Sequence, residues 1–534
     1  MSMFSIGLSG LNAAQNALNT TSNNISNVYT PSYNRELTQL GEGRIGGGVR
    51  VNDIERQFNT YVANQLNNAK TQSSALSTYN NQVSQIDNLL ADRAAGLSPL
   101  MQSFFSSLED LASSPSDPAA RQGVLGTANT LSAQFRSFDG YLQDMQSNIN
   151  NQIKDEITQV NNTVEQIAGL NREIVLARAR TGEAPNSLLN QRDHLVSELN
   201  ERMDLRLNVQ DGKTYNISLP NGQPLVTGTS SFKLEAVQAE NDPQRTVVGY
   251  RDGGGNLVQL DESIVQGGAL GGLMTFRAET LDKTQNQIGQ LAVSLSVAFN
   301  EQHKQGTDLN GDDGEDFFRV REPQVYGSSE NSATALIEFD TDNIGQLRAT
   351  DYTVSYDGTD FSVIRNDTGA AVAFERDNDQ LSFGGVTMTF GGDLENGDRF
   401  EVQPVRRAAA GMELAISEVD KIAAGEDAFS GDNRNALALQ SLQSQNIVGG
   451  NASVSGAYGA IVSDVGNRTN ITQVNLEARQ GLTDQLRAVQ QSESGVNLDE
   501  EAANLIRYQQ FYQANARVID TAGTIMDTIL NLRN

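Results

Sequence analysis

The chain has 534 residues, of which 38% are hydrophobic, enough for about three or four domains with modest cores. Its 38 basic and 66 acidic residues give a net charge of −28, which argues against a nucleic-acid partner because phosphate binding needs a basic surface. The absence of Cys excludes disulfide bonds, thiolate metal sites and a Cys nucleophile. No stretch reaches the roughly 18 apolar residues of a membrane helix, and the N-terminus lacks the basic start of a cleavable signal. Taken alone, these features predict a cytoplasmic protein without membrane insertion.

The first 34 residues predict an amphipathic helix. This segment contains no Lys, Arg, Asp or Glu. Large apolar residues follow one heptad line, with Gln15 and Ser22 at its two polar steps: Phe4, Leu8, Leu11, Leu18 and Ile25. Such a helix spans about 40–50 Å at 1.5 Å per residue and has one apolar face.

The stretch Gly41–Val51 is rich in glycine. Glycine-rich loops can hold phosphate, but this one lacks the Gly-Lys-Ser/Thr ending and the strand-to-helix setting of a nucleotide site. We interpret it as a flexible joint between the first helix and the body of the protein.

The next 150 residues predict a helical body. Helices are expected over Glu55–Leu90, Leu97–Leu111, Pro118–Phe138, Tyr141–Arg180 and Asn186–Leu207. The fourth carries a heptad line of Ile157, Val160, Val164, Ile167 and Ile174, and Thr181-Gly182 provides its end. The fifth contains His194, one of only two histidines; the other is His303. We interpret both as solvated or structural, since neither has a second histidine nearby.

The middle of the chain alternates between strands and helix. Short antiparallel strands are expected over Leu205–Leu260, followed by a helix over Gly271–Lys304 whose buried face contains Leu281, Ile288, Leu291, Leu295 and Phe299. In the acidic stretch Gly306–Phe318, Asp308, Asn310 and Asp312 occupy the first, third and fifth positions of a calcium loop. Asp313 and Arg319 replace the Gly and Glu that such a loop requires, so we favour an acidic connecting loop and keep calcium binding as the alternative.

The segment Pro323–Val405 is almost entirely β in character and predicts an independent sandwich or barrel. A helix over Glu413–Lys421, a glycine-rich stretch over Ala424–Asp432 and a long helix over Val454–Gln491 follow it. Gly495 then predicts a joint before the last helix.

The last helix is expected from Leu498 to Leu532. Asn497 can cap it, and Asp499, Glu500 and Glu501 follow in the first turn, with Glu500 at the position of a capping box. Its apolar face consists of two adjacent stripes: Leu498, Ala502, Leu505, Tyr512, Ala516, Ile519, Met526 and Leu530, and Tyr508, Phe511, Val518, Ala522, Ile525 and Ile529. An ordinary terminal helix buried on its own core would explain this face. Because the N-terminal helix is equally sticky, we expect instead that the two pair and that the rest of the chain is an insertion between them.

The predicted fold class is a multidomain α+β protein. Long terminal and body helices form a coiled-coil-like bundle, and antiparallel β domains are inserted into it. We divide the chain into 1–54, N-terminal helix and joint; 55–204, first part of the helical body; 205–265, small β region; 266–322, helix and acidic loop; 323–405, outer β domain; 406–493, second part of the body; and 494–534, C-terminal helix.

Both ends of the chain resemble the flagellar axial proteins, the family of rod, hook and hook-associated proteins. The N-terminal motif of that family is retained in Asn23, Asn24, Ile25, Ser26, Asn27, Thr30, Pro31, Tyr33 and Arg35. Ser32 stands where the family usually has Gly, and a residue with a side chain disfavours positive φ. Ser494–Asn534 resembles the C-terminal signature, and Asn186–Leu207 and Gly306–Phe318 resemble internal segments of hook-associated members.

The resemblance implies a structural adaptor that joins the hook to the filament, without a catalytic role or cofactor. Its partners would be copies of itself in a ring at the junction, hook protein, hook-associated protein 3 and a cytoplasmic export chaperone that binds the C-terminal helix. The chain would leave the cell through the flagellar type III apparatus without a cleaved signal and reside in the extracellular flagellum. The terminal apolar residues would pair within and between subunits.

Three alternatives remain at this stage. The chain could be another axial protein, namely hook-associated protein 3 or hook protein. An extracellular hydrolase would need a pair of carboxylates in a cleft, and no motif singles out such a pair. An adhesin or glycan-binding module could occupy the outer β domain, since such folds host many functions.

Overall fold

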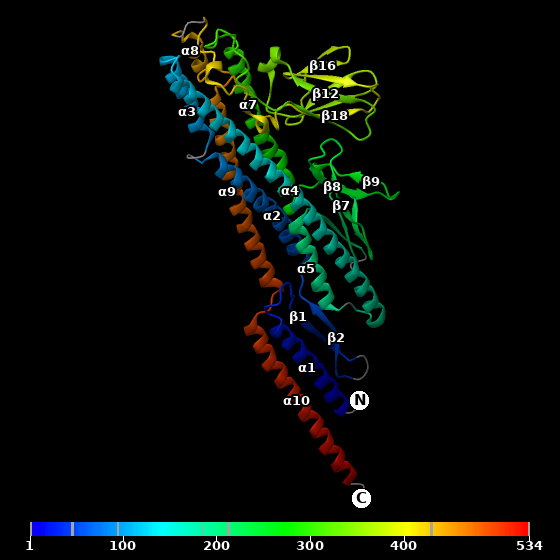
Figure 1. Cartoon of the computed structure of the whole chain (residues 1–534). Coiled ribbons are helices and arrows are strands. Elements are labelled where there is room, and N and C mark those ends of the chain that lie inside the picture. Colours follow the sequence, from blue (N-terminus) through cyan, green and yellow to red (C-terminus); the bar gives the residue numbers. More distant parts are fainter. Residues whose placement is uncertain are drawn as a thin grey trace.

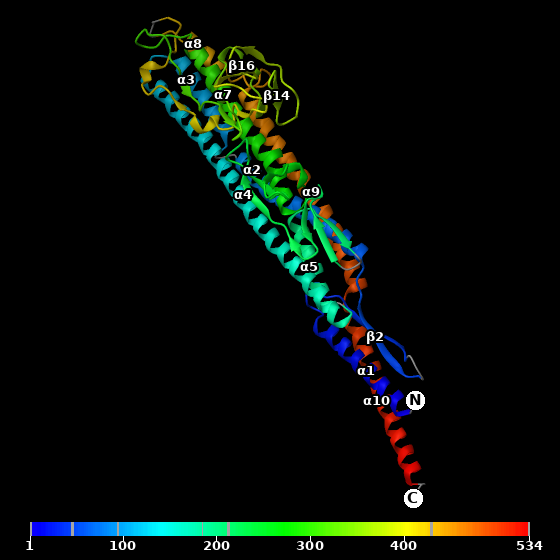
Figure 2. The same ribbon diagram turned by 90° about the vertical axis from the view of Figure 1, so that its right-hand side faces the viewer.

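The computed structural model describes residues 3–43, 47–92, 96–183, 185–210, 214–427 and 431–531. The molecule is elongated, with both termini at one end and the β domains along one side of the helical body (Figures 1 and 2). Within the described residues, no helix is long and apolar enough to cross a membrane.

The two terminal helices lie side by side and run antiparallel at the narrow end (Figure 1). They are α1 (Met3–Ser26) and α10 (Leu498–Asn531). A hairpin of β1 (Glu36–Glu42) and β2 (Val49–Arg56) packs against α1. We call these four elements the terminal unit. The predicted pairing of the terminal helices is confirmed; the predicted end at Leu532 lies outside the described residues.

The expected flexible joint over Gly41–Val51 is wrong. Most of its described residues belong to the hairpin, whose two strands pair from Glu36↔Arg56 to Glu42↔Val49, and residues 44–46 lie outside the described part. Glycine-rich sequence at a hairpin end suits a tight connection as well as it suits a loose one. The next helix therefore begins later than predicted.

Eight α-helices build the described part of the body: α2 (Thr60–Leu90), α3 (Leu97–Ser113), α4 (Pro118–Thr181), α5 (Asn186–Arg202), α6 (Gly268–Phe276), α7 (Asp282–His303), α8 (Arg434–Ser441) and α9 (Val454–Ser494). A π-helical turn, Arg277–Leu281, joins α6 to α7. Asn59 caps α2 by accepting the Tyr61 and Val62 amides at 3.0 and 3.2 Å.

The predicted break between Phe138 and Tyr141 is wrong, because both residues lie within α4, a single helix of 64 residues. Gly140 costs about 1 kcal/mol in a helix interior, and burial of Phe138 and Leu142 on either side outweighs that penalty. Asp117 caps the start, and Gly182 ends the helix at φ +85°, as expected. The five residues of the predicted heptad line are all buried.

The expected helix over Glu413–Lys421 is also wrong. β19 (Glu413–Leu414) pairs with β10 (Phe318–Arg319), and only Val419–Lys421 forms a short 3₁₀ turn. The helix α8 was not predicted. Both differences fall where short apolar runs do not distinguish strand from helix.

The expected β regions are confirmed. Two small sheets cover α4: β3 (Arg206–Gln210), β4 (Thr214–Ser218), β5 (Pro224–Thr227) and β6 (Ser230–Ser231) form one, and β7 (Leu234–Gln238), β8 (Thr246–Arg251) and β9 (Leu257–Gln259) form the other. The outer domain has two four-stranded antiparallel sheets, in the orders β11-β18-β13-β14 and β12-β17-β16-β15. Their strands are β11 (Gln324–Gly327), β12 (Thr334–Phe339), β13 (Tyr352–Tyr356), β14 (Phe361–Arg365), β15 (Glu375–Asp377), β16 (Gln380–Phe383), β17 (Val386–Gly391) and β18 (Arg399–Gln403).

The body and the outer domain have separate hydrophobic cores. The larger core extends along the helical body, and all five residues predicted for the buried face of the 271–304 helix belong to it. The smaller core lies in the outer domain around Tyr352, Leu381, Met388 and Phe400. The terminal unit contributes no residue to either described core. Its structure therefore depends on the contacts that its own four elements make with one another.

Candidate assembly site

Small residues hold α1 against α10. A Cβ atom added to Gly10 would lie 2.1 Å from Asn515 Oδ1, and one added to Gly7 would lie 2.8 Å from Ile519 Cγ1. These glycines begin a second heptad line of buried residues on α1: Gly7, Gly10, Ala14, Ala17, Thr21 and Asn24. The close approach of the two helices therefore follows from residues with little or no side chain.

The predicted apolar line of α1 does not make this contact. Phe4 and Leu8 remain 52% and 45% exposed, while Leu11, Leu18 and Ile25 are half-buried. Within one chain Phe4 and Leu8 therefore do not pack against α10, and their expected role in assembly stays a prediction for contacts between subunits. The alternation of three and four between the small residues was visible in the sequence and was the signal for the true contact line.

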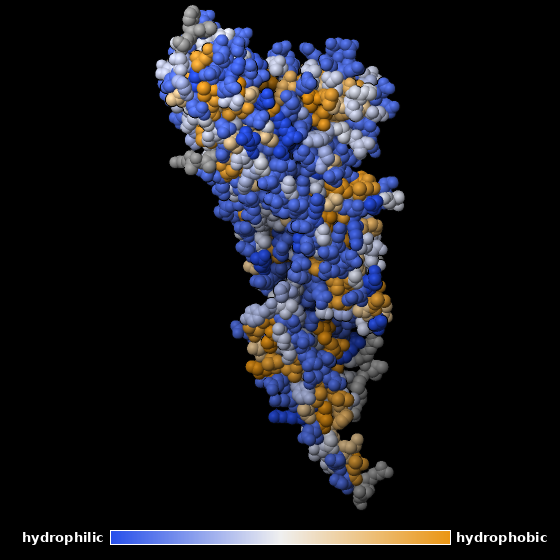
Figure 3. All heavy atoms as spheres, viewed as in Figure 1, coloured by the Kyte–Doolittle hydropathy of each residue, from blue (hydrophilic) through white to orange (hydrophobic). Residues whose placement is uncertain are grey.

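Half of the apolar face of α10 is also open to solvent. Leu498, Phe511, Ile525, Met526, Ile529 and Leu530 are between 38% and 59% exposed, and Leu505, Tyr508, Tyr512, Val518 and Ile519 are half-buried. Figure 3 shows apolar side chains concentrated over this end of the molecule. Because Gly7 lies opposite Ile519, the last turns of α10 extend beyond α1 (Figure 1).

The interpretation of α10 as an ordinary helix buried on its own core is wrong. Glu501 is the one buried residue in the described part of α10. Monomeric soluble proteins rarely expose large contiguous apolar patches, and this face extends along a helix of 34 residues. The face is therefore a candidate surface for assembly.

Asn24 connects three parts of the terminal unit. Its Nδ2 group donates to Glu36 O at 2.9 Å and to Glu501 Oε2 at 3.1 Å. Its Oδ1 atom accepts from the Tyr33 hydroxyl at 2.9 Å and from the Glu36 amide at 3.0 Å. The buried side chain uses its full hydrogen-bonding capacity, which explains the need for an amide at this position.

Glu501 receives the other half of the N-terminal motif. Its Oε1 atom accepts from Arg35 Nε at 2.8 Å, and neighbouring Glu500 accepts from Arg35 Nη1 at 2.6 Å. Asn497 caps α10 as predicted, accepting the Asp499 amide at 3.0 Å. Glu500 is thus drawn to Arg35, and the capping box has only its Asn497 half among the described contacts. Burial, together with the charges of Glu36 and Glu501, raises the pKa of Tyr33, so its hydroxyl stays protonated and donates.

Ser32 has a positive φ, a backbone conformation that a residue with a side chain disfavours. Its φ is +59°, and in the described chain only Asn378 joins it as a non-glycine residue with positive φ. The Ser32 hydroxyl lies 3.0 Å from His194 Nδ1 on α5. The remaining motif residues make local contacts: Asn27 donates to Asn23 O, Thr30 donates to Asn27 Oδ1, and Ser26 and Pro31 are exposed.

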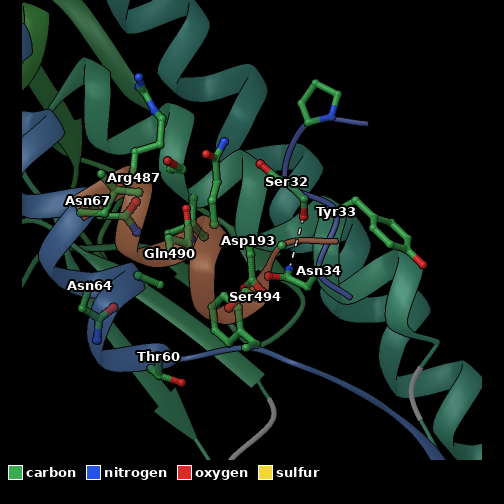
Figure 4. A pocket seen from close by; sticks show the side chains of 18 of the residues that line it. Ser32, Tyr33, Asn34, Thr60, Asn64, Asn67, Asp193, Arg487, Gln490 and Ser494 are labelled. Carbon is green, nitrogen blue, oxygen red and sulfur yellow. Dashed lines mark hydrogen bonds between the residues drawn. The ribbon is translucent and has the colours of Figure 1, made fainter. Parts of the chain in front are cut away.

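A cavity of about 640 Å³ lies between this turn and the body. Its walls come from the turn at Ser32–Asn34, the start of α2, the middle of α5 and the end of α9 (Figure 4). Thr60, Asn64 and Asn67 of α2 lie on one side, and Gln490 and Ser494 of α9 lie nearby. The terminal unit therefore meets the body through a narrow neck that has this cavity beside it.

The acidic loop and the second histidine are tied into the body. The Lys421 ammonium lies 3.4 Å from Asp308 Oδ2 and 3.3 Å from Asp312 Oδ2, where a bound cation would otherwise balance their charge. Within the described residues, no group of three or more His, Cys, Asp or Glu has an arrangement suited to a metal ion.

His303 is fully buried: its Nδ1 lies 2.6 Å from Glu315 O, and its Nε2 accepts the Ala423 amide at 2.9 Å. Burial lowers its pKa, consistent with a neutral structural ring.

Buried charges join the outer domain to the body. Arg406, which follows β18, pairs with Asp351 of the outer domain and lies 3.3 Å from Asp242 in the β7–β8 loop. It also lies 3.6 Å from Asp282 of α7, which pairs with Arg245. Burial, reinforced by the charge of Asp351, raises the pKa of Glu401 to about 8. The aspartates of this cluster are paired with Arg406 and Arg245, which connect three parts of the fold, whereas Glu401 accepts hydrogen bonds from Thr353 and Asn366.

Models of flagellar protein families match four regions of the chain. The model of the flagellar hook-associated protein FlgK helical domain matches residues 83–318, and that of the flagellar hook-associated protein 1 D2-like domain matches residues 326–404. The flagella basal body rod protein model matches residues 4–33, and the flagellar basal body rod FlgEFG protein C-terminal model matches residues 490–532. The two terminal matches contain nearly all of α1 and the whole of α10.

Several relatives align over the whole chain. Flagellar hook-associated protein 1 of Salmonella typhimurium is 42% identical over 555 residues, and that of Escherichia coli is 42% identical over 545 residues; each alignment covers 100% of both proteins. The Bacillus subtilis protein of the same name is 23% identical over 573 residues, with 98% of this chain and 96% of the relative covered. Among solved structures, the flagellar hook junction protein FlgK from Burkholderia pseudomallei aligns with a TM-score of 0.75 and 27% identity, covering 80% of this chain and 100% of that one.

Proposed function

Because this chain belongs to the flagellar hook-associated protein 1 family, we propose that it is a structural adaptor that joins the hook of a bacterial flagellum to its filament. The observation that carries the proposal is the terminal unit. Residues from the two ends of the chain meet there through Asn24, Arg35 and Glu501, apart from the body. The unit presents apolar residues that its own chain does not cover.

The mechanism is burial of these residues between neighbouring copies. Phe4 and Leu8 on α1, together with Ile525, Met526 and Ile529 on α10, are among the exposed large apolar residues of the terminal unit. Each large side chain contributes about 1.5–3 kcal/mol when fully buried. A few such contacts per copy stabilise a ring, and Leu11, Leu18 and Ile25 extend the same line toward the neck.

The proposed partners follow from this role. Copies of the chain contact one another in the ring, hook protein lies on one side of it, and hook-associated protein 3 lies on the other. A cytoplasmic export chaperone covers the apolar face of α10 before assembly, which prevents aggregation. The chain is exported through the flagellar type III apparatus without a cleaved signal and functions outside the cell. It needs no cofactor and performs no catalysis.

The seven sequence segments serve this function as three parts. The segments 1–54 and 494–534 mediate assembly, the segments 55–322 and 406–493 form the body, and the outer domain at 323–405 projects from it. The buried ion pairs of Arg406 support this arrangement because they fix the outer domain on the body.

Truncation of α10 tests the proposal. A chain that lacks residues 505–534 should keep a folded body, measured by circular dichroism and thermal melting, and should fail to support filaments in cells that lack the native protein. A finer version changes Ile525 and Met526 to Asp, and its matched control changes Ile471 and Val474 of α9, which are 52% and 59% exposed, to Asp. Normal flagella with the truncated chain would refute the proposal.

A further inference from the structure

Three chain crossings form the neck between the terminal unit and the body. They are residues 33–35, 56–59 and 494–497, and the backbone of Arg35 connects all three. Its amide donates to Ser494 O at 2.8 Å, and its carbonyl accepts the Gln57 amide at 2.7 Å. Because these two backbone hydrogen bonds meet at one residue, they do not by themselves fix the angle between the two halves of the molecule.

One face of α5 lies against this neck. Arg56 Nη1 lies 2.6 Å from Asp193 Oδ2 and donates to Asn190 Oδ1 at 3.0 Å. Asn34 Nδ2 donates to the same Asn190 oxygen at 2.7 Å, so Asn190 joins two of the three crossings. Asn186, one turn earlier, donates to Ile54 O at 2.8 Å. Arg56 and Asp193 are each about 11% exposed, so water screens their attraction only weakly.

Other contacts of α5, with α4 and β4, fix this helix to the body. Arg192 donates to Asn171 Oδ1 of α4 at 3.1 Å and stacks over the Tyr215 ring at 3.5 Å. The Tyr215 hydroxyl donates to Asp193 Oδ1 at 2.7 Å, which holds the carboxylate that binds Arg56. Burial raises the pKa of Tyr215 to about 12, so this hydroxyl keeps its proton. The short sequence Asn190–Asp193 thus bonds to the body and to the terminal unit at once.

We propose that Asn190 and Asp193 are positioning residues that fix the angle between the terminal unit and the body. The purpose of a fixed angle rests on the proposed function: copies that assemble through their terminal units then direct their bodies identically. We call the contacts of Asn190 with Asn34 and Arg56, together with the Arg56–Asp193 ion pair, the clamp. All of its residues belong to one chain, so the clamp does not require assembly.

Distance measurement between spin labels on the full chain tests the clamp. The chain has no Cys, so Gln15→Cys on α1 and Lys154→Cys on α4 place single labels at exposed positions in the two halves. Double electron–electron resonance should give one narrow distance distribution. Arg56→Gln combined with Asn190→Ala should broaden it at least twofold, while Arg56→Lys, which can keep the ion pair, should leave it narrow.

A matched control removes an ion pair of similar length elsewhere. Arg251→Gln breaks the exposed 2.7 Å contact with Glu235 in the β7–β8 hairpin and should leave the distribution unchanged. A distribution that is already broad in the native chain overturns the clamp, as does equal width in the double variant or equal broadening in the control. Because the test uses the free chain, these outcomes do not depend on whether the chain joins hook to filament. Loss of filaments with unchanged distances would overturn the clamp and leave the proposed function standing.

Discussion

Asn24 and Glu501, which are 477 positions apart in the chain, share a buried hydrogen bond of 3.1 Å. Asn24 ends the small-residue line of α1, and Glu501 stands in the first turn of α10, so this contact joins the two helices where both approach the neck. The same carboxylate also binds Arg35. The two terminal sequence signatures are therefore one structural unit.

Removal of the Glu501 carboxylate should loosen the terminal unit. Glu501→Ala leaves Asn24 and Arg35 without their shared partner, and loss of one member of a buried pair costs about 3 kcal/mol. We expect amide hydrogen exchange in α1 to accelerate by about 100-fold, the equivalent of that energy. Glu500→Ala is the control, since Glu500 is 57% exposed and an exposed ion pair contributes less than about 1 kcal/mol. Equal effects of the two variants would contradict the assigned role of Glu501.

Substitutions on the two lines of α1 should have different effects. Gly10→Leu inserts a side chain where Asn515 already lies, and overpacking of this kind costs about 1–3 kcal/mol. It should reduce hydrogen-exchange protection of α1 and α10 in the free chain. Leu8→Ala removes an exposed side chain, so it should leave that protection intact and weaken filament attachment. Reduced protection with Leu8→Ala, or full protection with Gly10→Leu, would show that the contact lines are assigned the wrong way round.

Position 32 should accept glycine and reject β-branched residues. At φ +59° a non-glycine residue costs about 1–3 kcal/mol, so Ser32→Gly should be neutral or slightly stabilising despite the lost contact with His194. Ser32→Val should lower the free energy of unfolding by about 1–2 kcal/mol in denaturant titrations. Ser26→Val, at an exposed helical position, is the control and should change stability by less than about 0.5 kcal/mol. A destabilising Ser32→Gly would mean that the hydroxyl contact outweighs the backbone strain.

Glu401 should make stability depend on pH. Its pKa rises from 4.5 to about 8 in the folded chain, so the folded state holds this proton more tightly than the unfolded state. The sign follows directly: this contribution to stability is lost as pH rises from about 4.5 to 8. Glu401→Gln cannot ionise, so its melting temperature should exceed that of the native chain at pH 9 and approach it at pH 5.

The control for this experiment is Glu330→Gln, at an exposed position of the same domain. Its difference from the native chain should be the same at both pH values. A pH-independent difference for Glu401→Gln as well would show that burial of Glu401 does not favour its protonated form.

Much of the fold was predictable because it depends on local patterns. The heptad lines of α4 and α10, the Gly182 helix end and the alternating strands of the outer domain are periodicities that each segment carries by itself. The terminal signatures likewise identified the paired ends. The hairpin, the short β19 strand and the continuity of α4 through Gly140 were missed, because cross-strand pairing and burial by distant segments decide them.

The candidate assembly site shows the same division. The spacing of apolar residues predicts that both ends are amphipathic helices with their apolar residues on one face of each. The sequence places two heptad lines on α1, one of large residues and one of small residues, and either satisfies the helical period. The packing of the folded chain places the small line against α10. Helices that approach closely enough for Gly7 and Gly10 to touch α10 leave no space for Phe4 or Leu8 between them, so the large residues remain outside.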